Sequence, residues 1–295
     1  MKKILSIFLV IIILCTFASC KNKLDGSEGL EYGLNIDGNG YYVKGLGTCT
    51  EANIIIPSKI DGLPVTSIGN EAFMDCDLIE SIVIPNTVKS IGDYAFKGCY
   101  SLESIDIPYS VTSVGEYAFA DCTEIEEITI PYSLTSFGAW AFDGCENLSK
   151  VHYTGDIDNW AEIKFYPYNS NPMKYATDLY FDGELVTSVE IPDYISSIGS
   201  FAFEGVASLT SVYIPSSVTS IGEMAFLGCY SLQSITIPNS ITNIGQLAFS
   251  QCTSLVTISF EGTKAEWINI EKGTYWYDKI PATEVICTDG TVSIK

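Results

Sequence analysis

The chain has 295 residues, of which 17% are charged and 47% are hydrophobic, a balance typical of a folded rather than a disordered protein. Its formal net charge is -21, and all of its basic residues are lysines. A nucleic-acid-binding surface needs a basic stripe, usually with arginine, so this composition excludes nucleic acid as a partner.

The first twenty residues, MKKILSIFLVIIILCTFASC, have the pattern of a secretory leader. Two lysines precede an apolar run that is shorter than the ~20 residues of a membrane span. The run ends in Phe17-Ala18-Ser19-Cys20, which resembles the lipobox of bacterial lipoproteins, whose cysteine becomes lipidated. We therefore expect a signal peptide at 1–19 and a lipidated tether at 20–30, attached through Cys20. Ordinary secretion and an uncleaved anchor are the alternatives.

Two alternating stretches follow around Asp37-Gly38-Asn39-Gly40. Asn and Gly tolerate positive φ, so this pattern predicts a β-hairpin. A calcium loop would need more oxygen ligands and a distal carboxylate at a fixed spacing, which favours the turn. We expect residues 31–57 to form an N-terminal cap and the first strand.

A 23-residue unit then repeats through most of the chain, which predicts a solenoid of stacked coils. Three markers keep this period within each half of the chain. The prolines are Pro85, Pro108 and Pro131, then Pro192, Pro215 and Pro238. The phenylalanines are Phe73, Phe96, Phe119 and Phe142, then Phe203, Phe226 and Phe249. The glycines are Gly69, Gly92, Gly115 and Gly138, then Gly199, Gly222 and Gly245.

One unit illustrates the local physics. Ile105 and Ile107 alternate with polar residues, which predicts a strand with one buried face, and Pro108 ends it because proline has no N–H to donate. A second short strand leads to Gly115, and residues 116–122 suggest a single helical turn whose alanine and phenylalanine point inward. Each unit buries its apolar face only by stacking on its neighbours.

The repeat is lost in two segments that resemble each other. Residues 154–184 and 261–295 both contain a glycine followed at the same spacing by a tryptophan, at Gly155 and Trp160 and at Gly262 and Trp267. We interpret both as variant units with a short amphipathic helical turn, the second being the C-terminal cap. Residues 31–295 then form one repeat domain.

The pattern LxSIxIPxSVTSIGxxAFxGCxS resembles the leucine-rich repeats of the BspA type, found in surface and secreted proteins of bacteria and some protozoan parasites. The resemblance covers about residues 49–260. It implies a mainly β solenoid with parallel stacked strands and short helical turns, exposure at the cell surface, and adhesion to proteins or matrix. It implies no shared ligand residues.

Most of the ten cysteines occupy one repeat position, three residues after the phenylalanine; these are Cys76, Cys99, Cys122, Cys145, Cys229 and Cys252. Val206 fills this position in another unit, and valine can only pack. This favours a ladder of buried free thiols over disulfides, although stacked coils bring neighbouring Cα atoms to about 5 Å and do not forbid bridging.

No catalytic motif is present. The single histidine, His152, falls at an outward strand position with no nucleophile motif nearby, so an exposed histidine is favoured over a catalytic triad. Nor does the chain contain a P-loop, HExxH, GxGxxG or CxxC sequence. We expect no catalysis, no cofactor and no metal.

The outward strand positions form the candidate binding face, and small hydroxyls predominate there. Its larger groups, with two tyrosines just beyond the strands, are Asp106, Tyr109, Tyr132, His152, Glu190 and Tyr213. A broad rigid face of this kind suits a protein, matrix or glycan ligand. An alternative glycan pocket would use aromatics of the mid-array segment, Trp160, Phe165, Tyr166 and Tyr168.

The expected function is therefore that of a cell-surface or extracellular lipoprotein, attached to a bacterial membrane only through its lipid, that binds a macromolecule. A carbohydrate-binding accessory protein and a structural surface spacer are the alternatives.

Overall fold

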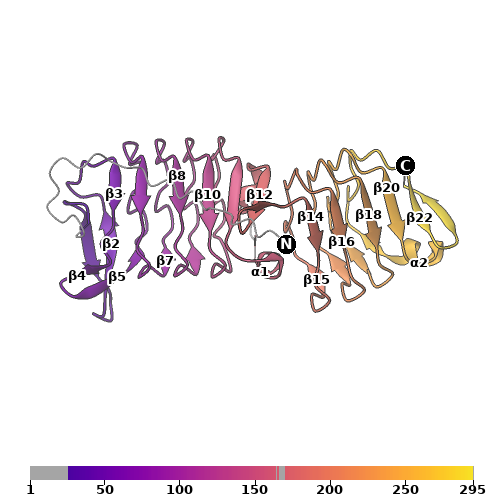
Figure 1. Ribbon diagram of the computed structural model, residues 1–295, viewed down its shortest axis with the longest axis horizontal. Coiled ribbons are helices and arrows are strands. Elements are labelled where there is room, and N and C mark those ends of the chain that lie inside the picture. Colours follow the sequence, from indigo (N-terminus) through magenta and orange to yellow (C-terminus); the bar gives the residue numbers. More distant parts are fainter. Residues whose placement is uncertain (1–25, 164, 166–169, 295) are drawn as a thin grey trace, which may run out of the picture.

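Parallel strands stacked in two long rows make up an elongated solenoid (Figure 1). The structure is a computed structural model that describes residues 26–163, 165 and 170–294. The predicted signal peptide and Cys20 lie outside the described residues. The predicted fold class, a solenoid with a period of about 23 residues and very little helix, is confirmed.

We call the row that carries the candidate face the main strand row. Its strands are β3 (Asn53–Ile55), β6 (Ser81–Val83), β8 (Ser104–Asp106), β10 (Glu127–Ile130), β11 (Lys150–Tyr153) and β12 (Asp178–Phe181), then β14 (Ser188–Glu190), β16 (Ser211–Tyr213), β18 (Ser234–Ile237), β20 (Thr257–Phe260) and β22 (Glu284–Cys287). Equivalent residues of consecutive units lie opposite each other, as Ser104 does to Glu127. The sequence period therefore sets the register.

The second row consists mostly of two-residue strands, with two longer strands near its N-terminal end. The strands of this row are β2 (Tyr41–Gly45), β5 (Leu63–Ile68), β7 (Ser90–Ile91) and β9 (Ser113–Val114), then β15 (Ser197–Ile198), β17 (Ser220–Ile221), β19 (Asn243–Ile244) and β21 (Glu271–Lys272). The remaining elements are β1 (Glu31–Leu34), β4 (Lys59–Ile60), α1 (Ile157–Glu162), the 3-10 helix η1 (Pro172–Lys174), β13 (Glu184–Leu185), α2 (Lys264–Asn269) and β23 (Gly290–Ser293). Strands β1 and β2 form the hairpin expected around residues 37–40.

The third side of each coil consists of turns, and here the structure differs from the expected helical turn. Ala118 and Phe119 are buried as predicted, but Tyr117 and Asp121 have positive φ of 52° and 59°. The backbone N–H groups of Tyr117 and Phe119 therefore point along the solenoid and donate to the carbonyls of Ala139 and Ala141 in the next coil. A regular helical turn would direct these donors along its own axis.

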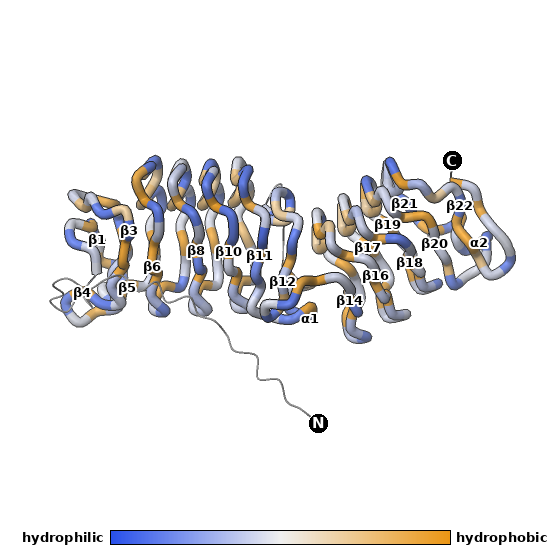
Figure 2. The backbone as a smooth tube through the Cα atoms, turned by 45° about the horizontal axis from the view of Figure 1, so that its top comes forward, coloured by the Kyte–Doolittle hydropathy of each residue, from blue (hydrophilic) through white to orange (hydrophobic). Residues whose placement is uncertain are grey.

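The core is a continuous stack of equivalent side chains. The rings of Phe73, Phe96, Phe119 and Phe142 stack with centroids 5.3, 5.3 and 5.5 Å apart, and the rings of Phe203, Phe226 and Phe249 stack at 5.4 and 5.3 Å. Apolar segments recur from coil to coil in register (Figure 2). No described cysteine forms a disulfide. The Cys122 thiol donates instead to the Phe96 carbonyl at 3.1 Å, and its neighbours repeat this bond.

The main strand row is interrupted between β12 and β14, which divides the solenoid into a first array (residues 31–185) and a second array (residues 186–294) (Figures 1 and 2). Each array closes in the same way. Helix α1 precedes the antiparallel pair β12 and β13, just as α2 precedes β22 and β23. The predicted helical turn is present in both segments, so the mid-array segment is a terminal cap placed inside the chain.

Among the described residues, no helix has the length and apolar character needed to cross a membrane.

Candidate binding face

The outward residues of the main strand row form a face that is open to solvent. Along β8 the burial alternates, with Ile105 buried and its neighbours Ser104 and Asp106 exposed. Because successive strand side chains point to opposite sides, every unit presents its polar residues on this face. Asp106, Glu190 and Tyr213 all lie there as expected, and Tyr213 is 57% exposed.

In the first array the face carries an internal ion-pair cluster. Glu127 on β10 accepts contacts from Lys150 Nζ at 3.8 Å and from His152 Nε2 at 3.5 Å, both on the neighbouring strand β11. The His152 ring stacks on Tyr180 of β12, with centroids 4.7 Å apart. His152 is therefore half-buried between a carboxylate and a tyrosine ring, rather than the freely exposed histidine that the sequence favours.

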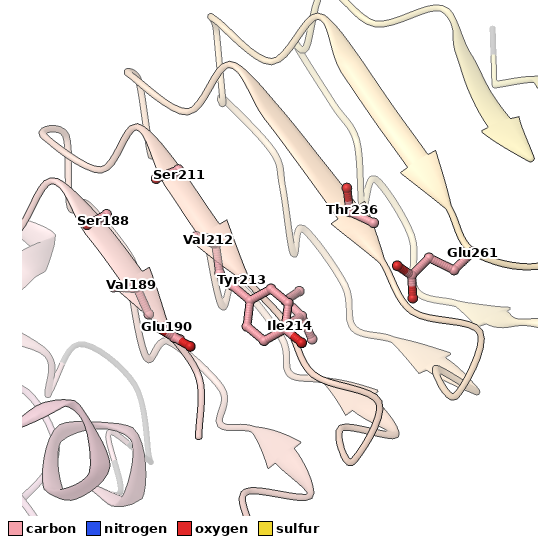
Figure 3. Close-up of a pocket in the computed structure, with 9 residues that line it drawn as sticks. All are labelled: Ser188, Val189, Glu190, Ser211, Val212, Tyr213, Ile214, Thr236 and Glu261. Atoms are coloured by element: carbon pink, nitrogen blue, oxygen red, sulfur yellow. The ribbon is translucent and has the colours of Figure 1, made fainter. Parts of the chain in front are cut away.

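In the second array the face is hollowed. The hollow encloses about 340 Å³ and is lined by strand residues and one residue beyond β20; these are Ser188, Val189, Glu190, Ser211, Val212, Tyr213, Ile214, Thr236 and Glu261. Glu190 lies opposite Tyr213 in the parallel pairing of β14 and β16. Figure 3 shows the carboxylate of Glu261 turned back toward Thr236 and the Tyr213 ring. The hollow thus places two carboxylates and a tyrosine ring together.

Two further tyrosines of the predicted face lie just past the strands. Tyr109 and Tyr132 are 62% and 57% exposed. Each follows the proline that ends its strand, so the loop holds its side chain outside the core. These two positions are accessible to a large ligand.

The alternative pocket is built differently from the expectation. Trp160 is fully buried, and its ring packs against Tyr153 and Phe165, with centroids 5.1 and 5.2 Å away. Phe165 is buried too. Both rings fill the core of the internal cap and offer no surface to a glycan, while Tyr166 and Tyr168 lie outside the described residues.

The comparisons with known proteins agree with this geometry. The family described as BspA type leucine rich repeat region, with six copies, matches residues 48–173 and 174–285. The chain belongs to the BspA-type leucine-rich repeat family. The family places it among repeat proteins of the surface or binding type. The comparison with curated proteins found no match.

Several solved bacterial structures resemble this BspA-type protein. A leucine-rich repeat protein from Bacteroides ovatus is 28% identical, with a TM-score of 0.57 over 89% of this chain and 70% of that chain. The leucine-rich repeat protein TpLRR of T. pallidum is 25% identical, with a TM-score of 0.45 over 77% of this chain and 88% of that one. The pneumococcal vaccine antigen PcpA is 17% identical, with a TM-score of 0.46 over 89% and 86%.

Some residues of the BspA-type face escape prediction from the repeat alone. Glu261 stands at the repeat position that Pro215 and Pro238 occupy in earlier units, and this departure is the signal that could have found it. Tyr180 lies in the internal cap, where the repeat pattern is lost, so its strand was not recognised. Both become visible only once the register of the strands is known.

The turn side carries an aromatic row of its own. Tyr94, Tyr117 and Trp140 stack with centroids 5.1 and 5.2 Å apart, and Lys97 Nζ lies 5.7 and 5.5 Å from the two tyrosine rings. These rings face one another, so a ligand would meet mainly their edges. The row fits a stabilising ladder on the solenoid's surface.

Chemistry beyond binding has little support in the part of the BspA-type chain that the structure describes. No group of three or more His, Cys, Asp and Glu side chains there could hold a metal ion. Cys99 and Cys145 of the ladder are poor nucleophiles because burial raises the pKa of each thiol to about 12.

Proposed function

We propose that this protein is a lipid-anchored surface protein that binds another protein through the outward face of its main strand row. The observation that carries the proposal is the hollow in the second array, where Glu190, Tyr213 and Glu261 gather on a rigid and exposed sheet. The fold leaves these identities unspecified: other coils carry valine, aspartate, threonine, histidine or serine at the position of Glu190 and Tyr213, and Pro215 and Pro238 stand at the position of Glu261.

The shape of the face supports a large ligand. In a stacked sheet the backbone N–H groups of the strands are already paired, and the side chains stand at a fixed spacing. Few groups of the face therefore have to become ordered when a ligand binds. Exposed tyrosines are efficient contact residues because they bring large area for the loss of few rotatable bonds. Tyr109, Tyr132 and Tyr213 are all of this kind.

Saturable binding of the full chain, in mild detergent, to panels of matrix and cell-surface proteins tests this role. Tyr213→Ser should weaken binding about tenfold, as expected for an exposed aromatic contact. Tyr230→Ser is the matched control, because Tyr230 is also exposed but lies outside the strand face. Equal effects of the two substitutions, or no saturable binding to any panel, would contradict the proposal.

The lipid anchor is tested separately. The leader and the Phe17-Ala18-Ser19-Cys20 sequence support lipidation of Cys20. Cys20→Ser should move the protein from the detergent phase to the aqueous phase in phase separation. A wild-type protein found in the aqueous phase would show that the anchor is absent, without affecting the binding role.

A further inference from the structure

The hollow of the second array is lined by two carboxylates and a tyrosine ring, and no basic side chain lines it. Glu190 lies on the strand next to that of the exposed Tyr213 ring, and Glu261 follows β20, two strands away on the other side, with Thr236 of β18 between (Figure 3). In the described residues, neither carboxylate forms an ion pair. The negative charges and the ring face therefore remain available to a ligand.

The first array shows how N–H donors of the chain itself meet a carboxylate on the same face. There, Lys150 and His152 contact the carboxylate of Glu127, and the planar ring of His152 stacks on Tyr180 at 4.7 Å. A planar group with N–H donors thus occupies the space between a carboxylate and a tyrosine. The chain supplies this group itself in the first array.

The second array has no counterpart to that group. The outward residues of its strands β14, β16, β18, β20 and β22 are Ser188, Glu190, Ser211, Tyr213, Ser234, Thr236, Thr257, Ser259, Glu284 and Ile286. None of them is basic. Of the three described lysines of this array, Lys272 bonds to the carbonyls of Trp267 and Ile270, the Lys264 ammonium lies next to Gly290, and Lys279, like the other two, does not line the hollow. The deficit of positive charge is local to the hollow.

We propose that the hollow binds an arginine side chain of a partner protein, with the guanidinium stacked on the Tyr213 ring over Thr236 and its N–H groups donating to Glu261, while the Glu190 carboxylate on the other side of the ring adds to the attraction. This inference rests on the proposed function and names the chemistry of the partner. The guanidinium is planar, carries five donors and stacks on aromatic faces while it pairs with carboxylates, which a lysine ammonium does less well. The ring and the charges therefore select arginine.

The openness of the hollow identifies the source of the arginine. A volume of about 340 Å³ on an exposed sheet leaves one side of any ligand in solvent. Free arginine would gain too little contact to be held, whereas an arginine borne by a protein adds contacts along the rest of the strand face. The site is an anchor point within a larger interface.

Ligand-observed NMR titration of the full chain with a short Gly/Ser peptide that carries one arginine tests the proposal. The comparison peptide has citrulline, a neutral group of the same shape, in place of arginine. At physiological ionic strength, which screens distant charges, the arginine peptide should bind several-fold more tightly than the citrulline peptide. Equal affinities would overturn the proposal.

Substitutions locate the site. The affinity for the arginine peptide should fall three- to tenfold with Glu190→Gln, Glu261→Gln or Tyr213→Leu. Tyr213→Phe, which keeps the ring, should change this affinity less than twofold. Glu271→Gln is the matched control, because Glu271 is an exposed carboxylate of the same array outside the hollow. If Glu271→Gln lowers the affinity for the peptide as much as Glu261→Gln does, the peptide is attracted by the overall negative charge of the protein. That result would overturn the inference.

The outcome separates this inference from the proposed function. If Tyr213→Ser abolishes binding of a protein partner but Glu190→Gln and Glu261→Gln do not affect it, the face binds protein without an arginine anchor. A lysine peptide that binds as tightly as the arginine peptide would also overturn the assignment to arginine.

Discussion

The indole Nε1 of Trp160 donates a hydrogen bond of 2.7 Å to the carbonyl of Ala202, and this bond joins the two arrays. Trp160 belongs to helix α1 of the internal cap, and Ala202 belongs to the first complete coil of the second array. Asn171 adds a parallel contact from the same cap, donating from Nδ2 to the carbonyl of Phe201 at 2.7 Å. A cap that would otherwise end the solenoid thus serves as the first layer of its second half.

We predict that Trp160→Phe uncouples the arrays. The substitution leaves the buried Ala202 carbonyl without its donor and removes ring volume, at a cost of about 2–4 kcal/mol. Because a repeat array stays cooperative only through the interfaces between its units, the loss should separate one thermal transition into two. Differential scanning calorimetry measures this.

Trp267→Phe is the control for this prediction. Trp267 is the equivalent tryptophan of the C-terminal cap and is also buried, but the rings that pack on it, those of Phe260 and Trp276, belong to its own array. Its replacement should lower the melting temperature without splitting the transition. A single transition in Trp160→Phe would show that the two arrays do not depend on this contact.

The second prediction concerns the glycines of the repeat. The same glycine-to-alanine substitution should change stability differently at two equivalent repeat positions. A Cβ at Gly222 would lie 2.5 Å from the backbone N of Ser200 in the preceding coil. Gly222→Ala should therefore destabilise the protein by about 2–3 kcal/mol, as overpacking does. At Gly199 the preceding layer is the internal cap, and the nearest atom is the Ala161 carbonyl oxygen at 3.5 Å.

Gly199→Ala should consequently be neutral or stabilising by up to about 1 kcal/mol, because alanine loses less backbone entropy on folding. Urea denaturation of both variants gives the comparison. Destabilisation by Gly199→Ala to the same degree as Gly222→Ala would mean that glycine is needed for its backbone conformation and not for the close approach of coils.

The inside of this protein is predictable from sequence and the outside is only partly so. Ile105 and Phe119 recur with the repeat because each must pack on its own equivalent one coil away, so a fixed period reveals both fold and register. The backbone conformation of the turn side is harder to predict from the sequence. A positive φ at a tyrosine such as Tyr117 is imposed by hydrogen bonds to the next coil, and nothing in residue preference signals it.

The candidate site shows the same limit. Glu190 and Tyr213 were identified as outward residues from strand alternation. Their association with Glu261 depends on a side chain that reaches back across neighbouring strands (Figure 3), which requires the three-dimensional arrangement. His152 was recognised as outward, yet its contact with Glu127 depends on the pairing of β10 with β11.

The joint between the arrays also makes stability depend on pH. Burial at the joint raises the pKa of Glu204 to about 7, and the positive charge of Lys174 opposes this shift only in part. Lys174 lies 3.3 Å from Asp143 on its other side. The folded protein therefore holds a proton on Glu204 that the unfolded chain releases near its ordinary pKa, so stability is lost as the pH rises from about 4.5 through 7.

Glu204→Gln should remove this loss, because the amide keeps the shape of the protonated acid. Glu204 is half-buried, so we expect a gain of about 1–2 kcal/mol at pH 8 and little change at pH 5. Glu223→Gln, in the following coil, serves as control. Equal gains of Glu204→Gln at both pH values would contradict the titration of this carboxyl between them.

The thiol ladder makes the last prediction, which concerns reactivity. Burial raises the pKa of Cys99 and of Cys145 to about 12, and each thiol donates to a phenylalanine carbonyl at 3.1 Å. At pH 8 only about one such thiol in ten thousand is ionised, and the thiolate is the reactive form. Cys76, at the first rung, is only half-buried.

Brief alkylation of the native protein, read by peptide mass spectrometry, should therefore modify Cys76 well before Cys99 or Cys145. All three should react within minutes in denaturant without reductant. Peptides joined by a disulfide between neighbouring rungs, or thiols that stay unreactive in denaturant until they are reduced, would show instead that the ladder is oxidised in the native protein.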